Sequence, residues 1–164
     1  THVNRRKALF EEAIALARRG CHIDITAFPV EEGEDAWSAD EALFRYLDSG
    51  APPQRVSISS DAGGCLPCFD HEGRITHMDV GHSGALLDTL NALLARGLPL
   101  EQALPAFTAN PAALLRLPGK GRIDVGFDAD LLALDATGQV RHLLARGAWH
   151  VRDGACVRRG MFEP

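Results

Sequence analysis

The chain has 164 residues, of which 46% are hydrophobic and 24% charged, a balance that supports a compact domain with a hydrophobic core. Its 22 acidic residues outnumber the 17 lysines and arginines, and the net charge of −5 argues against nucleic acid or an anionic membrane as a partner. No apolar stretch approaches the roughly 20 residues of a membrane span, and four cysteines are too few for a disulfide scaffold. We therefore expect a cytoplasmic protein with reduced thiols. Because the first residue is Thr1 rather than Met, we also expect a portion of a longer protein.

Two amphipathic helices alternate with two short strands in the first 61 residues. Residues 6–19 repeat apolar side chains at helical spacing, whereas residues 22–28 alternate apolar and polar side chains as a strand does. The spacing of Ser38 and Glu41 predicts a capping box at the start of a second helix, and residues 55–61 have the composition of a second strand. Because helices connect the strands, we predict parallel strands in an α/β fold.

The following segment is predicted to be mainly helical. A glycine-rich loop over residues 62–84 precedes a leucine-rich helix that ends near Gly97, and a short helix follows over residues 100–107. Asn110 and Pro111 then supply an N-cap and a proline at the first helical position, which predicts one more helix.

The character of the sequence changes near residue 118. Glycines recur every few residues between the short runs ADLLALD, VRHLLARG and WHVRDG, which is typical of a β-meander. We therefore predict two parts, an α/β part over residues 1–117 and a small β-rich module over residues 118–164.

Functional side chains in parallel α/β folds lie where strands end, at the carboxyl edge of the sheet. Asp61 follows the second predicted strand, and His2 holds the same place if residues 1–3 end an earlier strand. A histidine and an aspartate there can ligate a divalent metal, and the aspartate can also take a proton from water. Arg5 could hold a substrate carboxylate. The alternatives are a terminal histidine, a turn-capping aspartate and a solvated arginine.

Cys65 and Cys68 form a CxxC pair, which is compatible with a zinc knuckle or a redox dithiol. A zinc site needs a second ligand pair, for which only His71 or the remote residues 21–22 are candidates, and a redox pair normally opens a helix. We interpret the spacing as structural or incidental. The two other cysteines are expected to pack as small hydrophobic side chains: Cys21 and Cys156.

Several segments together resemble the C-terminal part of an amidohydrolase-superfamily enzyme, and they are most similar to the isoaspartyl dipeptidase (β-aspartyl peptidase) family. The resemblance implies the C-terminal part of a TIM-type (β/α)8 barrel, strands six to eight, followed by strands of a small β-sandwich domain. The segments are THVNR at 1–5, HIDIT at 22–26, SSDAGG at 59–64, FDHEG at 69–73 and TANPAALLRLPGKGRIDVGFDADLLALD at 108–135.

The resemblance also implies roles for four residues. His2 matches a metal-ligating histidine at the end of barrel strand six, and Arg5 matches an arginine that binds a substrate carboxylate. Asp61 matches the strand-eight aspartate, which ligates the other metal and shuttles the proton. Cys65 stands where the family has a substrate-binding serine. Two Zn²⁺ ions would occupy a complete site, with the remaining ligands upstream of this chain.

The implied activity is hydrolysis of β-aspartyl (isoaspartyl) dipeptides by a metal-bound hydroxide, with a small-molecule dipeptide as substrate and a homo-oligomer as the assembly. Two alternatives remain open. The chain could come from another amidohydrolase, such as a dihydroorotase- or D-aminoacylase-like enzyme, or it could be a non-catalytic fragment that lacks the upstream metal ligands.

Overall fold

The computed structural model describes residues 1–70 and 72–161, which fall into two compact units. The first unit is Thr1–Pro111, and the second begins at Ala112. Each unit is described by itself. No helix in the described ranges is long and apolar enough to cross a membrane, and the expected cytoplasmic location stays a prediction.

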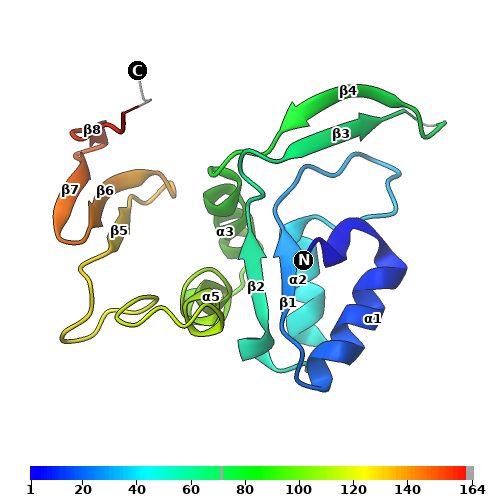
Figure 1. Ribbon diagram of the computed structural model, residues 1–164, viewed down its shortest axis with the longest axis horizontal. Helices are drawn as coiled ribbons and strands as arrows, with labels where there is room; N and C mark the ends of the chain where they lie inside the picture. The colour runs from blue at the N-terminus through cyan, green and yellow to red at the C-terminus, as the bar shows by residue number, and fades with distance from the viewer. Residues whose placement is uncertain (71, 162–164) are drawn as a thin grey trace. The chain divides into compact units, whose positions relative to one another are not determined.

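The first unit is built on two parallel strands, β1 (Ile23–Thr26) and β2 (Val56–Ser59). Ile25 lies opposite Ile58 in the register, so the apolar residues of both strands share one face of this small sheet. Figure 1 shows the two strands side by side, with the chain between them passing through helix α2 (Ala39–Asp48). The predicted parallel α/β arrangement is confirmed, although both strands are shorter than predicted.

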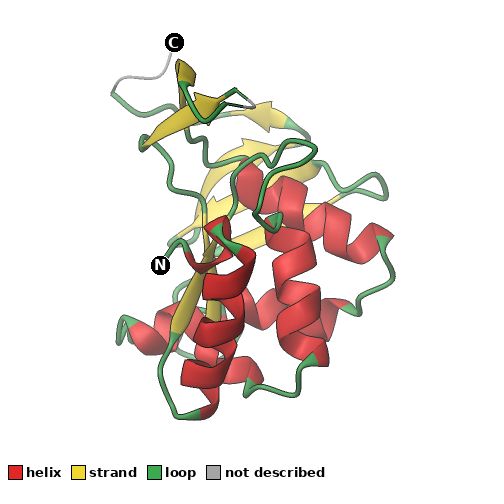
Figure 2. Ribbon diagram, turned by 90° about the vertical axis from the view of Figure 1, so that its right-hand side faces the viewer, coloured by secondary structure: helices red, strands yellow, loops and turns green. Residues whose placement is uncertain are grey.

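Helices cover the apolar face of the two strands. Besides α2, these are α1 (Lys7–Arg18) and α3 (Ala85–Ala95), and Figure 2 shows them gathered beside the strands. Phe10 of α1 and Tyr46 of α2 are fully buried, as the helical spacing of their apolar neighbours requires. The three predicted helices are therefore confirmed, and their buried faces form the core.

The predicted loop over residues 62–84 is wrong in part, because it contains a β-hairpin. Strand β3 (Cys65–Phe69) pairs antiparallel with β4 (Ile75–Val80). The Asp70 carboxylate accepts the backbone N–H groups of Glu72 and Arg74, both at 2.9 Å, and so stabilises the turn between the strands.

The helical segment after α3 is confirmed, but its capping is not as predicted. Short turns form α4 (Leu100–Ala103) and η3 (Leu104–Ala106), and α5 is Ala109–Leu114. Asn110 lies inside α5 rather than before it. Its side-chain amide donates to the carbonyls of Pro53 and Val56, both at 2.8 Å. These two hydrogen bonds attach the helix to the start of β2 and replace the predicted capping role. Two further single turns are η1 (Val3–Arg5) and η2 (Pro53–Arg55).

The second unit contains the predicted β-meander. Its four antiparallel strands follow one another in the order of the chain: β5 (Leu131–Leu134), β6 (Val140–Ala145), β7 (Ala148–Arg152) and β8 (Ala155–Cys156). The Arg146–Gly147 and Asp153–Gly154 turns have positive φ at both residues, which suits two-residue hairpins. The Lys120 ammonium contacts the carboxylates of Asp128 and Asp130. It thereby links the loop around Lys120 to the residues that directly precede β5.

Candidate active site

The polar face of the two parallel strands carries a carboxylate held by hydroxyl groups. The Asp24 carboxylate accepts from Ser57 Oγ at 2.7 Å, from Ser59 Oγ at 2.6 Å and from Thr1 Oγ1 at 3.1 Å. Strand alternation places the Asp24 side chain on the face of β1 that points away from the core. The register between β1 and β2 then brings the two serines of β2 to it. Sequence reasoning missed this cluster, which ties the N-terminal residue and both strands together.

His2 is fixed by a buried threonine on the same face. Its Nδ1 lies 2.9 Å from Thr26 Oγ1, and Thr26 is fully buried at the end of β1. The backbone of His2 is left-handed, with φ of 56°, and the turn η1 follows at once. Since the hydrogen bond uses Nδ1, Nε2 is the ring nitrogen that remains for a ligand.

Asn4 anchors the segment that carries His2 and Arg5. This fully buried side chain donates to the carbonyls of Thr26 at 2.9 Å and Trp37 at 2.8 Å, and accepts the N–H of Thr26 at 2.9 Å. The N–H of Thr26 would lose its partner without Asn4 in a position that is shielded from water, whereas the Thr26 carbonyl also accepts the N–H of Phe28 at 3.1 Å. Nothing in the local pattern around Asn4 predicts this role beyond its polar character.

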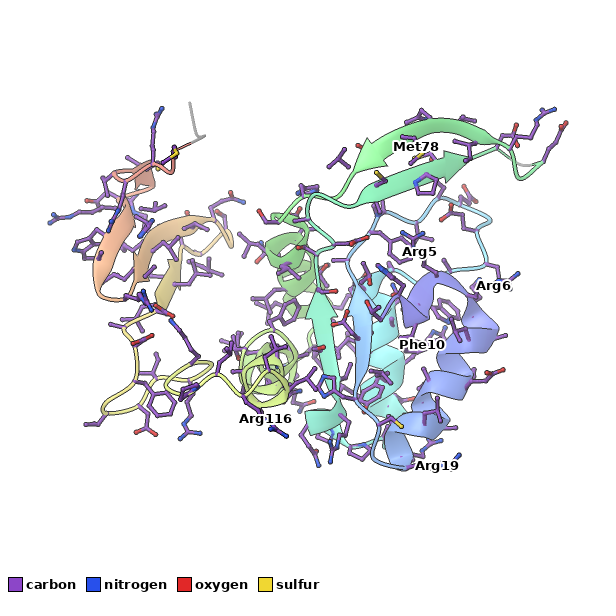
Figure 3. The ribbon with its side chains drawn as sticks, in the orientation of Figure 1. Arg5, Arg6, Phe10, Arg19, Met78 and Arg116 are labelled. Carbon is purple, nitrogen blue, oxygen red and sulfur yellow. The ribbon has the colours of Figure 1, made fainter. Side chains whose placement is uncertain are left out.

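Arg5 lies in a pocket of about 290 Å³, and a backbone hydrogen bond of 3.2 Å joins its N–H to the carbonyl of His2. Figure 3 shows it at the end of the N-terminal segment that faces the hairpin. Its guanidinium carbon lies 5.1 Å from the centre of the Phe28 ring, a cation–π distance. Its Nε is buried and has no hydrogen-bond partner among the described residues. A ligand carboxylate would satisfy that nitrogen. Other lining residues include Glu34, Asp35, Leu66, Pro67 and Cys68.

Asp61 begins a tight turn that links β2 to the hairpin. Its φ is 50°, and its carbonyl accepts the N–H of Gly64 at 2.8 Å. A Cβ at Gly81 would lie 2.3 Å from the Asp61 carbonyl oxygen, and one at Gly64 would lie 2.7 Å from Oδ1. Glycine is therefore required at both positions for the chain to approach Asp61 so closely.

The two predicted metal ligands, His2 and Asp61, do not form a complete metal site among the described residues. No hydrogen bond or ion pair links the Asp61 carboxylate to His2 in the ranges that the structure covers, and no group of three His, Cys, Asp or Glu side chains there could hold a metal ion. An imidazole nitrogen and a carboxylate oxygen are suitable donors for Zn²⁺, so the chemistry of the two residues fits, but two donors are fewer than zinc requires.

Cys65 and Cys68 lie at odd spacing on β3 and therefore face opposite sides of the hairpin. Cys65 is exposed, whereas Cys68 is half-buried and lines the Arg5 pocket. The two thiols thus do not face a common ligand. The expectation that the remaining two cysteines are packed inside is wrong, because both are exposed: Cys21, just after α1, and Cys156, in the edge strand β8.

The comparison with protein families decides the classification of the chain. The model of the amidohydrolase family matches residues 5–156. The chain belongs to the amidohydrolase family. Among curated relatives, a deacetylase of Agrobacterium fabrum is 28% identical over 167 residues, covering 87% of this chain and 40% of the relative. An allantoinase of Deinococcus radiodurans is 36% identical over 107 residues, covering 62% of this chain and 23% of the relative.

Solved structures resemble the chain over almost its whole length. The β-aspartyl dipeptidase of Fervidobacterium islandicum AW-1 in complex with β-Asp-Leu superposes with a TM-score of 0.84 and 33% identity. The match covers 98% of this amidohydrolase chain and 41% of that one, so this chain spans about two-fifths of the length of such relatives. These findings confirm the resemblance to isoaspartyl dipeptidases and the membership of a hydrolase family.

Proposed function

We propose that this amidohydrolase chain is the C-terminal portion of a longer enzyme that hydrolyses the isopeptide bond of β-aspartyl dipeptides. The observation that carries the proposal is the TM-score of 0.84 with a dipeptidase bound to β-Asp-Leu, at 33% identity over 98% of this chain. In this proposal, residues 1–117 contribute strands six to eight of the barrel, with β1 and β2 as the last two. Residues 118–164 belong to the small β-sandwich domain.

Two residues are proposed as ligands of a zinc pair, His2 through Nε2 and Asp61 through its carboxylate. Amidohydrolases generally use divalent metals, and Zn²⁺ would supply Lewis acidity toward the amide carbonyl and an activated water. The Asp61 carboxylate would accept a proton from that water and return it to the leaving amine. The glycines at 64 and 81 support this role because they let the chain turn closely around Asp61.

Arg5 is proposed to bind a carboxylate of the dipeptide. Its Nε is buried without a partner and its guanidinium is held against Phe28, so the side chain is oriented before substrate arrives. Cys65 is proposed as a weaker substrate contact, since a thiol is a poor hydrogen-bond donor compared with the serine of the family.

The test uses the full-length protein with zinc and two isomeric substrates, β-Asp-Leu and α-Asp-Leu. We expect turnover of the β isomer alone, and loss of turnover in Asp61→Asn with an unchanged circular dichroism spectrum. Activity retained by Asp61→Asn would contradict the proposed proton transfer. Absence of both bound metal and turnover in the well-folded full-length protein would support a non-catalytic role.

A second candidate is the hydrolysis of an N-acyl group or a cyclic amide. It is favoured by the similarity to the Agrobacterium deacetylase, which extends over 87% of this chain. N-acetyl amino acids and allantoin are therefore included in the same assay. Faster turnover of either compound than of β-Asp-Leu would replace the dipeptidase proposal by this one.

A further inference from the structure

The β3–β4 hairpin has one face that packs and one that does not. Leu66 is 8% exposed and lines the Arg5 pocket, which identifies the packed face. On the opposite face, Val80 lies across from Cys65, and Met78 lies across from Pro67. Met78 is 55% and Val80 59% exposed, and Cys65 is exposed as well. We define the exposed apolar face by Cys65, Met78 and Val80, since Pro67 is half-buried and also lines the Arg5 pocket. Such a face is unusual for a hairpin that faces water.

The outer edge of β4 is also open. Within the described ranges, β4 pairs only with β3. Gly81 donates to the carbonyl of Gly64 at 3.0 Å, so the alternation of an antiparallel ladder turns the backbone groups of Val80 and Met78 outward. The outward N–H of Val80 is met by the Asp79 side chain of its own strand at 2.7 Å. An open edge beside an apolar face is a template for another strand.

The sequence of this edge is complementary to itself. Residues 76–80 read Thr-His-Met-Asp-Val. In an antiparallel pairing of two copies about a two-fold axis at Met78, Met78 faces its own counterpart and His77 faces Asp79 of the other copy. The His77–Asp79 contact is then made twice, with an imidazole opposite a carboxylate each time. Such self-complementarity is what an isologous interface requires.

We propose that a second copy of this chain pairs its β4 with this β4, antiparallel and centred on Met78. The two hairpins then form one four-stranded sheet, with both copies of the apolar face on the same side. Two-stranded hairpins are marginal in water, and adding strands with a shared apolar face stabilises them. The partner is thus the same molecule, recognised through strand pairing and through two imidazole–carboxylate contacts.

The side chains at the edge of β4 can adopt the contacts that this pairing needs. Asp79 Oδ1 accepts a hydrogen bond from the Val80 N–H, a group that would pair with the strand of the second copy. When that strand binds the N–H, the Asp79 carboxylate becomes free to contact His77 of the other copy. His77 Nδ1 lies 3.1 Å from Thr76 Oγ1, which leaves Nε2 for that contact. Since Met78 presents its backbone groups outward, positions 77 and 79 form a non-hydrogen-bonded pair, where side chains approach most closely.

The test is a charge exchange, followed by sedimentation velocity of the full-length protein over a range of concentrations. His77→Asp places two carboxylates opposite each other, and we expect the dissociation constant of the dimer to rise on the order of tenfold. Asp79→His removes the same contact. The double variant His77→Asp, Asp79→His recreates the pair with its ends exchanged, and we expect it to restore dimerisation.

Asp48→His, at an exposed aspartate of α2 outside the hairpin, is the matched control and should leave association unchanged. Circular dichroism checks that each variant is folded. A monomeric parent protein would overturn the proposal. So would association that His77→Asp does not weaken, or a double variant that stays as dissociated as the single variants. Those results would mean that another part of the full-length protein covers the hairpin. This inference concerns assembly and stands apart from the proposed reaction.

Discussion

At the scale of single residues, the contact between His2 and Thr26 links a buried side chain to the proposed metal site. When Nδ1–H donates to the Thr26 hydroxyl, Nε2 carries the lone pair that a metal needs, and the ring is held in one orientation. Thr26 is fully buried, so water cannot replace it in this role. Thr26 is therefore expected to act through His2 rather than on the substrate.

Replacing Thr26 by valine keeps the shape of the side chain and removes the hydroxyl. We expect the zinc dissociation constant of the full-length protein to rise by roughly 10- to 100-fold. Thr26→Ser retains the hydroxyl and should stay close to the parent. Zinc competition with a chromogenic chelator measures both. Equal zinc affinity in Thr26→Val and the parent would show that His2 needs no such support.

Arg5 is expected to act on substrate affinity rather than on the chemical step. Arg5→Ala removes the guanidinium, whose Nε is buried. We expect kcat/KM for β-Asp-Leu to fall on the order of 100-fold, mainly through KM, because charged hydrogen bonds are lost. Arg19→Ala, at an exposed arginine just after α1 (Figure 3), is the control and should match the parent. A fall in kcat at unchanged KM would assign Arg5 to the transition state instead.

At the scale of elements, α5 is attached to β2 by a single side chain. The Asn110 amide serves the carbonyls of Pro53 and Val56, and Asn110 is 7% exposed. In Asn110→Ala both carbonyls lose a donor, and we expect a loss of about 1–3 kcal/mol in the free energy of unfolding. Urea unfolding measures it, with Gln102→Ala on α4 as a comparison at an exposed side-chain amide. A loss as small as that of the comparison would contradict the anchoring role.

The start of β1 is expected to make stability depend on pH. Burial, and to a lesser extent Arg55, lowers the pKa of His22 below 6.5, while Asp24 opposes the shift. His22 therefore binds a proton more readily in the unfolded chain than in the folded one. Its contribution to the free energy of unfolding is fully present above the unfolded pKa, and it is lost as the pH falls from there through the folded pKa. The urea midpoint should therefore fall between pH 7.5 and 5.5, and fall less in His22→Asn. The same replacement at the exposed His82 should not reduce the dependence.

Local periodicity was sufficient to predict α1, α2 and the two parallel strands, because each has one apolar face. The hairpin was missed because the glycines around it, such as Gly63, Gly64 and Gly81, are typical of a loop, whereas here they permit a close turn at Asp61. Asn110 was misassigned because its N-cap pattern is local, while its hydrogen bonds are to residues more than 50 positions away. Likewise, neither Asn4 nor Asp24 could be assigned before the strand register was known.

At the scale of the whole molecule, the resemblance assigned His2 and Asp61 to one metal site, but these residues supply only two donors. The described part of the chain holds no group of three metal-binding side chains, and the chain spans about two-fifths of the length of its relatives. Under the proposed function, the zinc pair would take its remaining ligands from the part of the longer enzyme that this chain does not span. Metal affinity is thus expected to be a property of the full-length protein.

The 164-residue chain should therefore bind zinc weakly, with a dissociation constant at least on the order of 100-fold above that of the full-length protein. Isothermal titration calorimetry of both proteins measures this, and circular dichroism checks that the shorter chain is folded. His2→Ala and Asp61→Asn should reduce the zinc affinity strongly in the full-length protein and hardly at all in the shorter chain. The reason is that two donors alone bind zinc weakly, so that removing one of them changes little. Tight zinc binding by the 164-residue chain, lost in His2→Ala, would instead mean that these residues form a site of their own.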